Sequence, residues 1–328
     1  MKVPRVKLGR RGPLVPVVFL GAWQAGGRMW GRLDREEYFR AVNRAVELGL
    51  LGFDTAEIYG AGASEKLLGE ALRRSGALEE AFIVTKVAGF RVTVSGVLKA
   101  VEGSSRRLGR RPDLVLYHWP PPLPFTACRA ARLLEEARRR RLTGYIGVSN
   151  FDHAELEEAA SCAEVVADQV HYSLAHRVPE NHLLPTTHRL GVAVMAWGPL
   201  AKGALAGKTR PDNLARATDP VFMRAARDGV LQEALASVAE RHGVSKAVVA
   251  LAWLISKGAL PVVGFRKRSH VEAAAQAASL HLGADDMKLL DEASARYRGR
   301  PCTRYRELHW NRFIPPPVQW LMYRLPGI

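Results

Sequence analysis

The sequence predicts a (β/α)8 barrel, and three observations predict it. Short apolar segments rich in β-branched residues alternate eight times with segments of helical periodicity along the 328 residues. Such an alternation indicates a parallel sheet, and eight strands are the number that closes a barrel. Polar side chains stand at the carboxyl ends of the expected strands, where the active sites of such barrels are built.

Eight short apolar segments are the expected strands of the barrel. We expect them at 17–21, 53–55, 82–86, 114–118, 145–149, 165–169, 192–197 and 260–264. Two further short strands flank the turn "GRRG" of residues 9–12, so we expect a hairpin that precedes the barrel.

Helical periodicity fills the intervals between these strands. Gly243 and Ser245 punctuate the longest such segment as a helix end and a helix N-cap. Because no Gly/Ser-rich or Pro-rich linker precedes the tail, we expect one domain over residues 1–328 with an irregular tail at 299–328. The expected helices are 35–48, 64–72, 92–108, 125–138, 153–160, 180–189, 231–256 with its break at "HGVS", and a last helix at 271–278.

Composition restricts the class of protein. The N-terminal segment has prolines, arginines and glycines where a signal peptide needs a continuous apolar region, and no uncharged apolar run of about 18 residues occurs. We therefore expect a soluble cytoplasmic protein with no membrane partner. The cysteines Cys128, Cys162 and Cys302 are odd in number, widely separated and without metal-ligand spacing. They predict reduced thiols, with neither a disulfide nor a metal site.

The formal charge of +16 is compatible with a nucleic acid, an acidic membrane surface or a phosphorylated ligand. Its arginines occur in short groups, "RRLGRR" at 106–111 and "RRRR" at 138–141, each at the polar end of a helical pattern. No aromatic residues are interleaved with them to stack on bases. We interpret these groups as solvated helix ends and expect no nucleic-acid partner.

Polar residues end five consecutive expected strands. A single acid, lysine or histidine at such a place is more often structural, but several at one barrel mouth indicate an active site. Tyr59 follows Asp54 by five residues, so it stands in the loop after the strand and reaches over the mouth. The residues at the strand ends are Asp54, Lys86, His118, Ser149 with Asn150, and Gln169.

These residue types fit the protonation of an alkoxide as a hydride arrives. A tyrosine with its ordinary pKa near 10 is a poor proton donor at neutral pH, but the ammonium of Lys86 favours the phenolate of Tyr59 and lowers that pKa. Asp54 can hold Lys86 by a paired hydrogen bond. His118 can donate a hydrogen bond to an oxygen of the reacting molecule.

Six motifs in this order resemble the aldo-keto reductase family: "GFDTAEIYG", "FIVTK", "LYHWP", "GYIGVSNF", "DQVHYSL" and "AWGPLAKGAL". The resemblance extends from the N-terminal hairpin to about Leu282. It implies a (β/α)8 barrel, NADP(H) bound without a Rossmann domain, and reduction of aldehydes or ketones. It also implies a catalytic tetrad of Asp54, Tyr59, Lys86 and His118, with Tyr59 as proton donor. A cofactor-binding regulatory or scaffold protein with the same barrel remains the alternative, and a nucleic-acid binder a third.

The same resemblance implies where the cofactor lies. Ser149, Asn150 and Gln169 match the positions that hold the nicotinamide carboxamide. Trp197 replaces the tyrosine or phenylalanine that stacks on the nicotinamide, and Ala274 replaces an asparagine near the adenine. The other contacts that we expect for this part of the cofactor are Gly21, Trp23, Asp54, Gly198, Pro199, Leu200, Gly203, Leu205 and Gly264.

The basic turn "GFRKRSHVE" at 264–272 follows the eighth expected strand. Helix N-termini with nearby bases bind phosphates. In the resembling family this turn holds the adenosine 2′-phosphate, which makes Arg266 the first candidate; a solvated basic turn is the alternative. The supporting candidates are Lys267, Arg268 and Ser269. "GALAGKT" at 203–209 has one residue too few between its glycines for a phosphate-binding loop.

Tryptophans near the strand ends are the expected walls of the substrate pocket. Trp23, Trp30 and Trp119 each follow a strand end at the mouth. The aromatic, basic tail resembles in position the C-terminal loop that walls the pocket in the family. A tail packed outside the barrel, on another subunit or on an acidic membrane is the alternative. The tail candidates for substrate contact are Trp310, Phe313 and Trp320.

Overall fold

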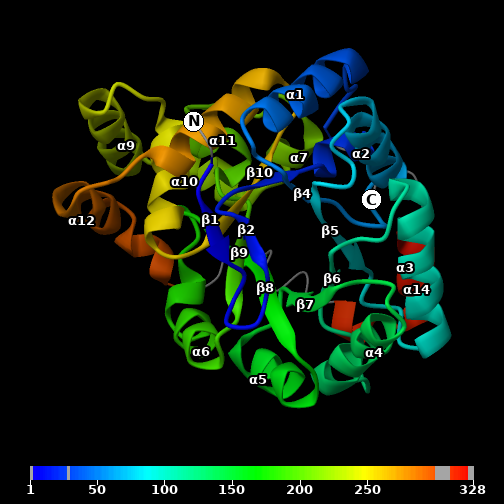
Figure 1. Cartoon of the computed structure of the whole chain (residues 1–328). Coiled ribbons are helices and arrows are strands. Elements are labelled where there is room, and N and C mark those ends of the chain that lie inside the picture. The colour runs from blue at the N-terminus through cyan, green and yellow to red at the C-terminus, as the bar shows by residue number, and fades with distance from the viewer. Residues whose placement is uncertain (1–2, 28–29, 300–310, 324–328) are drawn as a thin grey trace.

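A closed barrel of eight parallel strands forms the centre of the molecule (Figure 1). The computed structural model describes residues 3–27, 30–299 and 311–323. Strands follow one another around the barrel in chain order, and the last one pairs with the first to close it. The expected fold class is confirmed. The strands are β3 (Phe19–Gly21), β4 (Gly52–Asp54), β5 (Phe82–Val87), β6 (Leu114–Tyr117), β7 (Tyr145–Ser149), β8 (Val165–His171), β9 (Ala193–Trp197) and β10 (Leu260–Gly264).

A hairpin of β1 (Arg5–Lys7) and β2 (Leu14–Pro16) lies across one opening of the barrel (Figure 1). Leu8 and Val15 are fully buried and pack on side chains of the barrel interior. Gly9 has φ +66°, and a Cβ there would lie 2.7 Å from two backbone carbonyl oxygens, so this close approach requires glycine. The hairpin closes the amino-terminal end and leaves the carboxyl ends of the strands open.

Helices form the outer layer of the fold (Figure 1). Several begin where the sequence places an N-cap: Ser245 accepts a hydrogen bond from the backbone of Val248, and Asp152 and Glu155 form a reciprocal capping box. The helices are α1 (Arg35–Glu47), α2 (Ala63–Arg74), α3 (Val94–Leu108), α4 (Ala127–Arg139), α5 (His153–Cys162), α6 (Leu183–Leu190), α7 (Leu214–Ala217), α8 (Pro220–Arg227), α9 (Gly229–Arg241), α10 (Lys246–Ser256), α11 (Arg268–Ser279), α12 (Ala284–Ala293) and α14 (Pro316–Met322).

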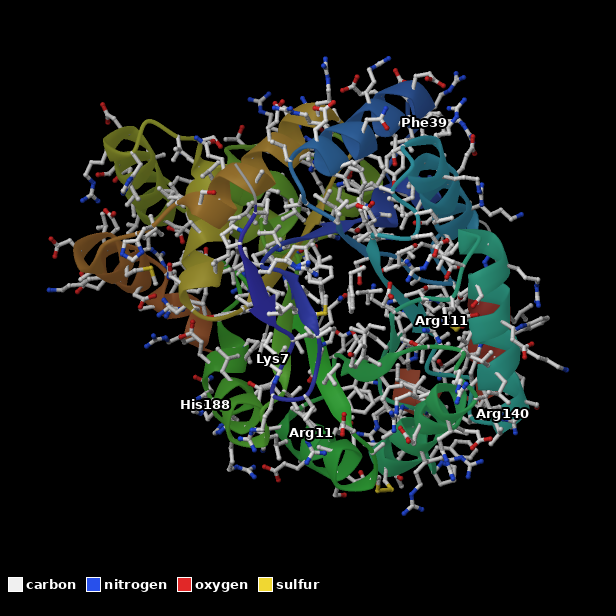
Figure 2. The ribbon with its side chains drawn as sticks, viewed as in Figure 1. Lys7, Arg11, Phe39, Arg111, Arg140 and His188 are labelled. Atoms are coloured by element: carbon white, nitrogen blue, oxygen red, sulfur yellow. A yellow bond between two sulfur atoms is a disulfide. The ribbon has the colours of Figure 1, made fainter. Side chains whose placement is uncertain are left out.

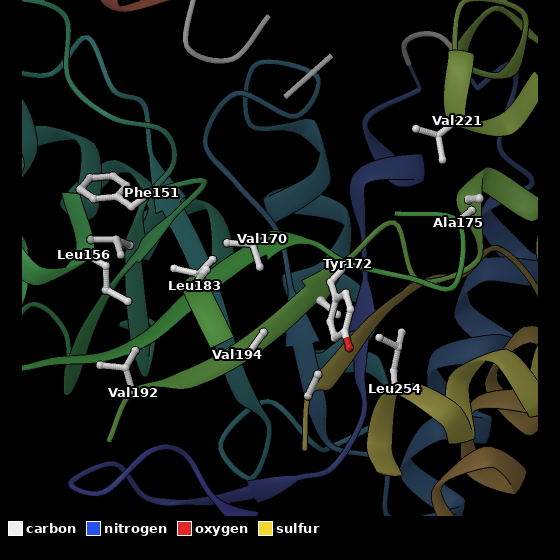
Figure 3. Packing of buried hydrophobic residues seen from close by; sticks show 14 of the residues in the cluster. Phe151, Leu156, Val170, Tyr172, Ala175, Leu183, Val192, Val194, Val221 and Leu254 are labelled. Carbon is white, nitrogen blue, oxygen red and sulfur yellow. The ribbon is translucent and has the colours of Figure 1, made fainter. Parts of the chain in front are cut away.

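The core has an inner and an outer part. Apolar side chains such as Phe19, Leu116 and Met195 fill the barrel interior. The outer part lies between the strands and the helices, where Val170 and Val194 of the sheet and Leu183 and Leu254 of helices belong to one cluster (Figure 3). This double layer fixes each strand, and therefore the side chains at its carboxyl end.

The expectation of a last helix at 271–278 is wrong, because α12 follows it and α14 lies in the tail. The tail that we expected to be irregular at 299–328 is therefore partly helical. The three prolines at 315–317 suggested a break in regular structure. Proline at the first positions of a helix is instead favourable, because its φ suits the turn and its missing N–H would have no partner there.

The expectation of reduced thiols is also wrong for two of the three cysteines. Cys128 in α4 and Cys162 at the end of α5 form a disulfide, at a sequence separation of 34. The distance along the chain concealed this pair, whereas the barrel packs α4 directly against α5. Cys302 lies outside the described residues.

Arg111 and Arg140 lie at the surface (Figure 2). Arg107 and Arg110 are mostly covered instead, and they pair with the buried Glu65 and with Asp113. Arg138 and Arg140 form ion pairs of 2.7 Å with Glu135 and Glu136 on the same helix. These pairs stabilise a helix by a few tenths of a kcal/mol at most, so they are features of a hydrated surface. Over the described part of the chain, no helix combines the length and the apolar character needed to cross a membrane.

We predict that Cys128→Ser lowers the free energy of unfolding by roughly 3–4 kcal/mol, since the disulfide closes a loop of 34 residues in the unfolded chain. Denaturation in urea without reductant measures the loss. Wild type with reductant is the control: it should lose the same stability, whereas reductant should not change the variant. Three free thiols in unreduced, unfolded wild-type protein would contradict the bridge.

Candidate active site

The carboxyl ends of β4 to β8 bring the polar strand-end residues to one rim of the barrel. Asp54 ends β4, Lys86 lies near the end of β5, and Ser149 ends β7. His118 follows β6, and Gln169 lies within β8. All five are buried, with 9% exposure or less. The rim is therefore built of polar groups that must satisfy one another or a ligand.

Lys86 is at the centre of this group. Its side chain is 1% exposed, and its Nζ donates hydrogen bonds to Asp54 Oδ1 at 2.6 Å and to the carbonyl of Thr55 at 2.9 Å. The third contact is with the hydroxyl of Tyr59 at 3.4 Å. Burial alone would lower the pKa of Lys86, but the charge of Asp54 and the hydrogen bonds to Asp54 and Tyr59 raise it above the ordinary value. Lys86 is thus a buried ammonium.

Tyr59 is held against this ammonium by the loop between β4 and α2. Gly60 has φ +61°, and a Cβ on it would lie 2.4 Å from the carbonyl oxygen of Gly26, so the loop packs closely on the segment after β3. Burial raises the pKa of Tyr59, and the charge of Lys86 opposes this rise only in part. The expectation that Lys86 lowers the pKa of Tyr59 overall is therefore wrong. Burial is the larger effect, and the phenol is protonated at neutral pH.

His118 faces Tyr59, with the two ring centres 5.6 Å apart. Burial and, second, the charge of Lys86 lower the pKa of His118 well below its ordinary value, so the imidazole is neutral. Its Nδ1 is buried and has no hydrogen-bond partner within the described chain. A neutral imidazole next to a phenol presents hydrogen-bonding groups to a ligand without adding charge.

The amide side chains on the rim form a connected set. Gln169 donates to Asp54 Oδ2 at 2.8 Å, so this carboxylate is bound on both oxygens. Asn150 donates to the carbonyl of His118 at 2.9 Å and accepts from Trp197 Nε1 at 2.8 Å. These bonds fix the orientation of the Trp197 ring and join β6, β7 and β9.

One face of the Trp197 indole stacks against a ring of the protein. His171 lies parallel to it with a 4.2 Å centroid distance, and His176 stacks on His171 at 4.2 Å in turn. Trp197 also lines the cavity described next. A flat ligand in that cavity therefore meets an indole whose position is already set by a stack and a hydrogen bond.

A cavity of about 480 Å³ opens over these residues. Aromatic side chains line it near His118, including Trp23, Trp119 and Tyr323. Three cations also line it: Lys202, which lies over the Trp23 ring and pairs with Asp219, and Lys208 and Arg216, which both pair with Asp212. Of the residues expected for cofactor and substrate, those that line it are Gly21, Trp23, Trp30, Asp54, Trp119, Ser149, Asn150, Gln169, Trp197, Gly198, Pro199, Leu200, Gly203 and Gly264.

The basic turn lies next to the cavity. Arg266 donates to the backbone carbonyls of Trp30, at 2.9 Å, and Arg32, while Lys267 precedes α11 and Ser269 lies in its first turn. Of the described residues of this turn, Gly264 and His270 line the cavity. The remaining expected residues, Arg266, Lys267, Arg268, Ser269 and the core residue Leu205, stand outside that wall.

Comparison with known proteins agrees with this geometry. The family model "Aldo/keto reductase family" matches residues 17–295. The chain belongs to the aldo/keto reductase family. Methylglyoxal reductase YeaE of Escherichia coli is 32% identical over 294 residues, which cover 87% of this chain and 93% of that protein.

Solved structures of aldo-keto reductases are similar over most of their length. One is a thermostable aldo-keto reductase in complex with the inhibitor epalrestat, with 31% identity, a TM-score of 0.75 and coverage of 88% of this chain and 99% of the other. Another is the aldo/keto reductase of Klebsiella pneumoniae in complex with NADP and acetate, with 28% identity, a TM-score of 0.73 and coverage of 92% and 98%.

Sequence reasoning missed several lining residues of this aldo/keto reductase. Lys202, Lys208 and Arg216 were not among its candidates, although Lys208 belongs to the "GKT" that fails as a phosphate-binding loop. The charges of Lys267, Arg266, Arg216 and Lys208 act, after burial, to lower the pKa of His270 to about 4. Four cations from two segments thus converge on one end of the cavity.

The tail meets the cavity through a residue that we did not single out. Tyr323 stacks on Trp119 with a centroid distance of 4.9 Å, and Gln319 accepts a hydrogen bond from Trp119 Nε1 at 3.2 Å. Phe313 is 76% exposed and Trp320 is 42% exposed, and neither belongs to the cavity wall as described. Trp310 lies outside the described residues.

The family resemblance places Ala274 near the adenine of the expected cofactor. This residue is fully buried in the core between α11 and the barrel, whereas its neighbour Ala273 lines the cavity. An alanine offers no hydrogen bond to a base. Any polar contact in this part of the wall therefore comes from other residues, such as His270.

We predict that Asp54→Asn lowers the free energy of unfolding by about 3–5 kcal/mol at neutral pH, because it leaves the ammonium of Lys86 buried without a counter-charge. The difference from wild type should shrink as the pH rises toward 10. In the variant, burial lowers the pKa of Lys86 in the folded state below its value in the unfolded chain. Stability therefore rises with pH between these two pKa values and levels off once the unfolded lysine also loses its proton. Urea denaturation at several pH values measures this. Glu136→Gln, at an exposed pair, should change stability by about 0.5 kcal/mol or less.

Proposed function

We propose that this chain is an NADPH-dependent reductase of aldehydes or ketones in which Tyr59 donates the proton. One observation carries the proposal: a buried ammonium, Lys86, is shared between the carboxylate of Asp54 and the hydroxyl of Tyr59 beside a cavity. A module that only bound a ligand would have no need of a buried charge beside a phenol.

The residues of the chain divide the proton chemistry among them. NADPH, when bound, supplies the hydride. Burial keeps Tyr59 protonated, so its hydroxyl is ready to give a proton to the carbonyl oxygen of the substrate. Lys86 then stabilises the phenolate, and Asp54 keeps Lys86 charged and in place. His118, neutral and facing Tyr59, orients the carbonyl oxygen by a hydrogen bond.

The cavity wall fits a dinucleotide of this kind. The free side of Trp197 offers a stacking surface for the nicotinamide, close to Ser149, Asn150 and Gln169. The cations Lys202, Lys208 and Arg216 offer charge for its phosphates. We infer that the adenosine 2′-phosphate binds near Arg266, and the effect of the Arg266 charge on His270 in the cavity wall supports this.

The aromatic wall supports carbonyl substrates with an apolar or planar body. Trp23, Trp119 and Tyr323 lie close to Tyr59 and His118 in the cavity wall. The relatives include a methylglyoxal reductase and a putative aryl-alcohol dehydrogenase of Schizosaccharomyces pombe. A panel of methylglyoxal, aryl aldehydes, ketones and sugars, followed by NADPH absorbance, tests the proposal. Bound NADP(H) without turnover of any of them would favour a regulatory protein.

Tyr59→Phe should reduce kcat for carbonyl reduction by about 10²–10⁴-fold, because the phenol proton is needed as charge develops on the oxygen. The dissociation constant for NADPH, measured by fluorescence quenching, should stay near wild type. An unchanged kcat in this variant would remove the proposed mechanism.

Arg266→Ala should raise the dissociation constant for NADPH by about 10- to 100-fold, the equivalent of losing a charge-assisted contact of roughly 1.5–3 kcal/mol. The constant for NADH should change little. Arg140→Ala removes a surface guanidinium elsewhere and serves as control for net charge. Equal weakening toward NADPH and NADH would show that Arg266 does not read the 2′-phosphate.

A further inference from the structure

Glu57 stands two residues before Tyr59, in the same loop, and its side chain is 7% exposed. It forms a two-pronged ion pair with Arg91: Oε1 accepts from Nε and Oε2 from one terminal nitrogen, both at 2.7 Å. Oε1 also accepts from the backbone N–H of Ala88 at 2.9 Å. We call these three groups the Glu57 clasp.

The clasp joins the loops that follow two strands of the tetrad. Glu57 belongs to the loop after β4, which carries Tyr59. Ala88 and Arg91 belong to the loop after β5, and Ala88 is two residues beyond Lys86. A backbone hydrogen bond from Glu57 to the carbonyl of Lys86, at 3.2 Å, starts the same connection. The two residues whose contact matters for proton transfer are therefore tied by their immediate neighbours.

A third strand is tied to the clasp through Tyr117. Its hydroxyl donates to the carbonyls of Gly89 and Arg91, at 3.1 and 3.0 Å. Tyr117 ends β6, and the next residue is His118. The segment 88–91 is thus bound to Glu57, in the loop of Tyr59, and to Tyr117, next to His118.

We propose that Glu57 is a positioning residue for the reduction: through Arg91 and Ala88 it holds the Tyr59 loop at the distance from Lys86 at which the phenol and the ammonium make contact. This inference rests on the proposed role of Tyr59. The contact between Tyr59 and Lys86 is 3.4 Å, the longest of the three that Lys86 makes, so a small shift of either loop breaks it first.

A purely structural role would have a different consequence. Arg177 and Glu180 form another buried two-pronged pair, at 2.7 and 2.8 Å, which packs against α12 and the segment after it, away from the cavity wall described above. Loss of Glu57 leaves Arg91, whose side chain is 27% exposed, without this carboxylate, and loss of Glu180 leaves the fully buried Arg177 with Asp291 alone among the described carboxylates. Both changes destabilise the fold. Only the Glu57 clasp bears on the tetrad, so the two variants separate positioning from stability.

The test compares Glu57→Gln with Glu180→Gln in the full chain. In both, the amide group turns an N–H toward the arginine and breaks the two-pronged bond, so both should lower the melting temperature. Glu57→Gln alone should reduce kcat for reduction by about 10- to 100-fold, the order of effect of a misplacement near 1 Å. The dissociation constant for NADPH should stay at the wild-type value in both.

The pH profile supplies the readout that stability does not move. Oxidation of the alcohol needs Tyr59 as phenolate, and the ammonium of Lys86 favours that phenolate. A looser contact raises the pKa of Tyr59, so in Glu57→Gln the rising limb of kcat for oxidation should move to higher pH. In Glu180→Gln the limb should stay where it is in wild type.

The outcomes are distinguishable from failure of the proposed function. A Tyr59→Phe enzyme that keeps its kcat overturns the proposed function and the clasp with it. An inactive Tyr59→Phe together with a Glu57→Gln of wild-type kcat and pH profile overturns the clasp alone. Equal losses of kcat in Glu57→Gln and Glu180→Gln also overturn it. If Glu57→Gln does not fold, Arg91→Lys keeps the charge and removes the two-pronged geometry. A shift of its rising limb of kcat for oxidation to higher pH then supports the clasp, and an unshifted limb overturns it.

Discussion

The ammonium of Lys86 is the constraint around which the rest of the site is arranged. A charge that is 1% exposed is tolerated only where opposite charge and hydrogen-bond acceptors surround it, and Asp54, Thr55 and Tyr59 provide them. Asp54 is held in turn by Gln169 from the far side of the mouth. One buried charge thereby fixes the relation of three strands and one loop.

The same charge separates the protonation states of its neighbours. Burial and, second, this charge keep the imidazole of His118 neutral. The same charge offsets part of the cost of ionising the buried Tyr59. One ammonium thus disfavours the charged form of His118 and favours the charged form of Tyr59, which faces it. A barrel can do this at the carboxyl ends of its strands because neighbouring parallel strands deliver side chains side by side at a fixed spacing.

The sequence predicted the eight strands, the hairpin and the strand-end residues because these depend on periodicity along the chain. The residues that it missed depend on contacts between distant segments. Tyr323 meets Trp119 across about 200 residues, and Cys128 meets Cys162 through the packing of two helices. The balance at Tyr59 also escaped prediction, because the sequence shows the nearby lysine but not how completely the phenol is buried. The roles assigned to the site residues remain predictions.

The arm of residues 311–323 lies beyond residue 295, where the match to the family ends. Arg312 nevertheless pairs with Glu155 of α5, Leu123 bonds to the backbone of Arg312, and Tyr323 forms part of the cavity wall. The tetrad residues and one part of the cavity wall therefore come from separate parts of the chain, the barrel and the arm. Substitutions at Tyr323 can therefore reshape the cavity without altering any residue of the barrel.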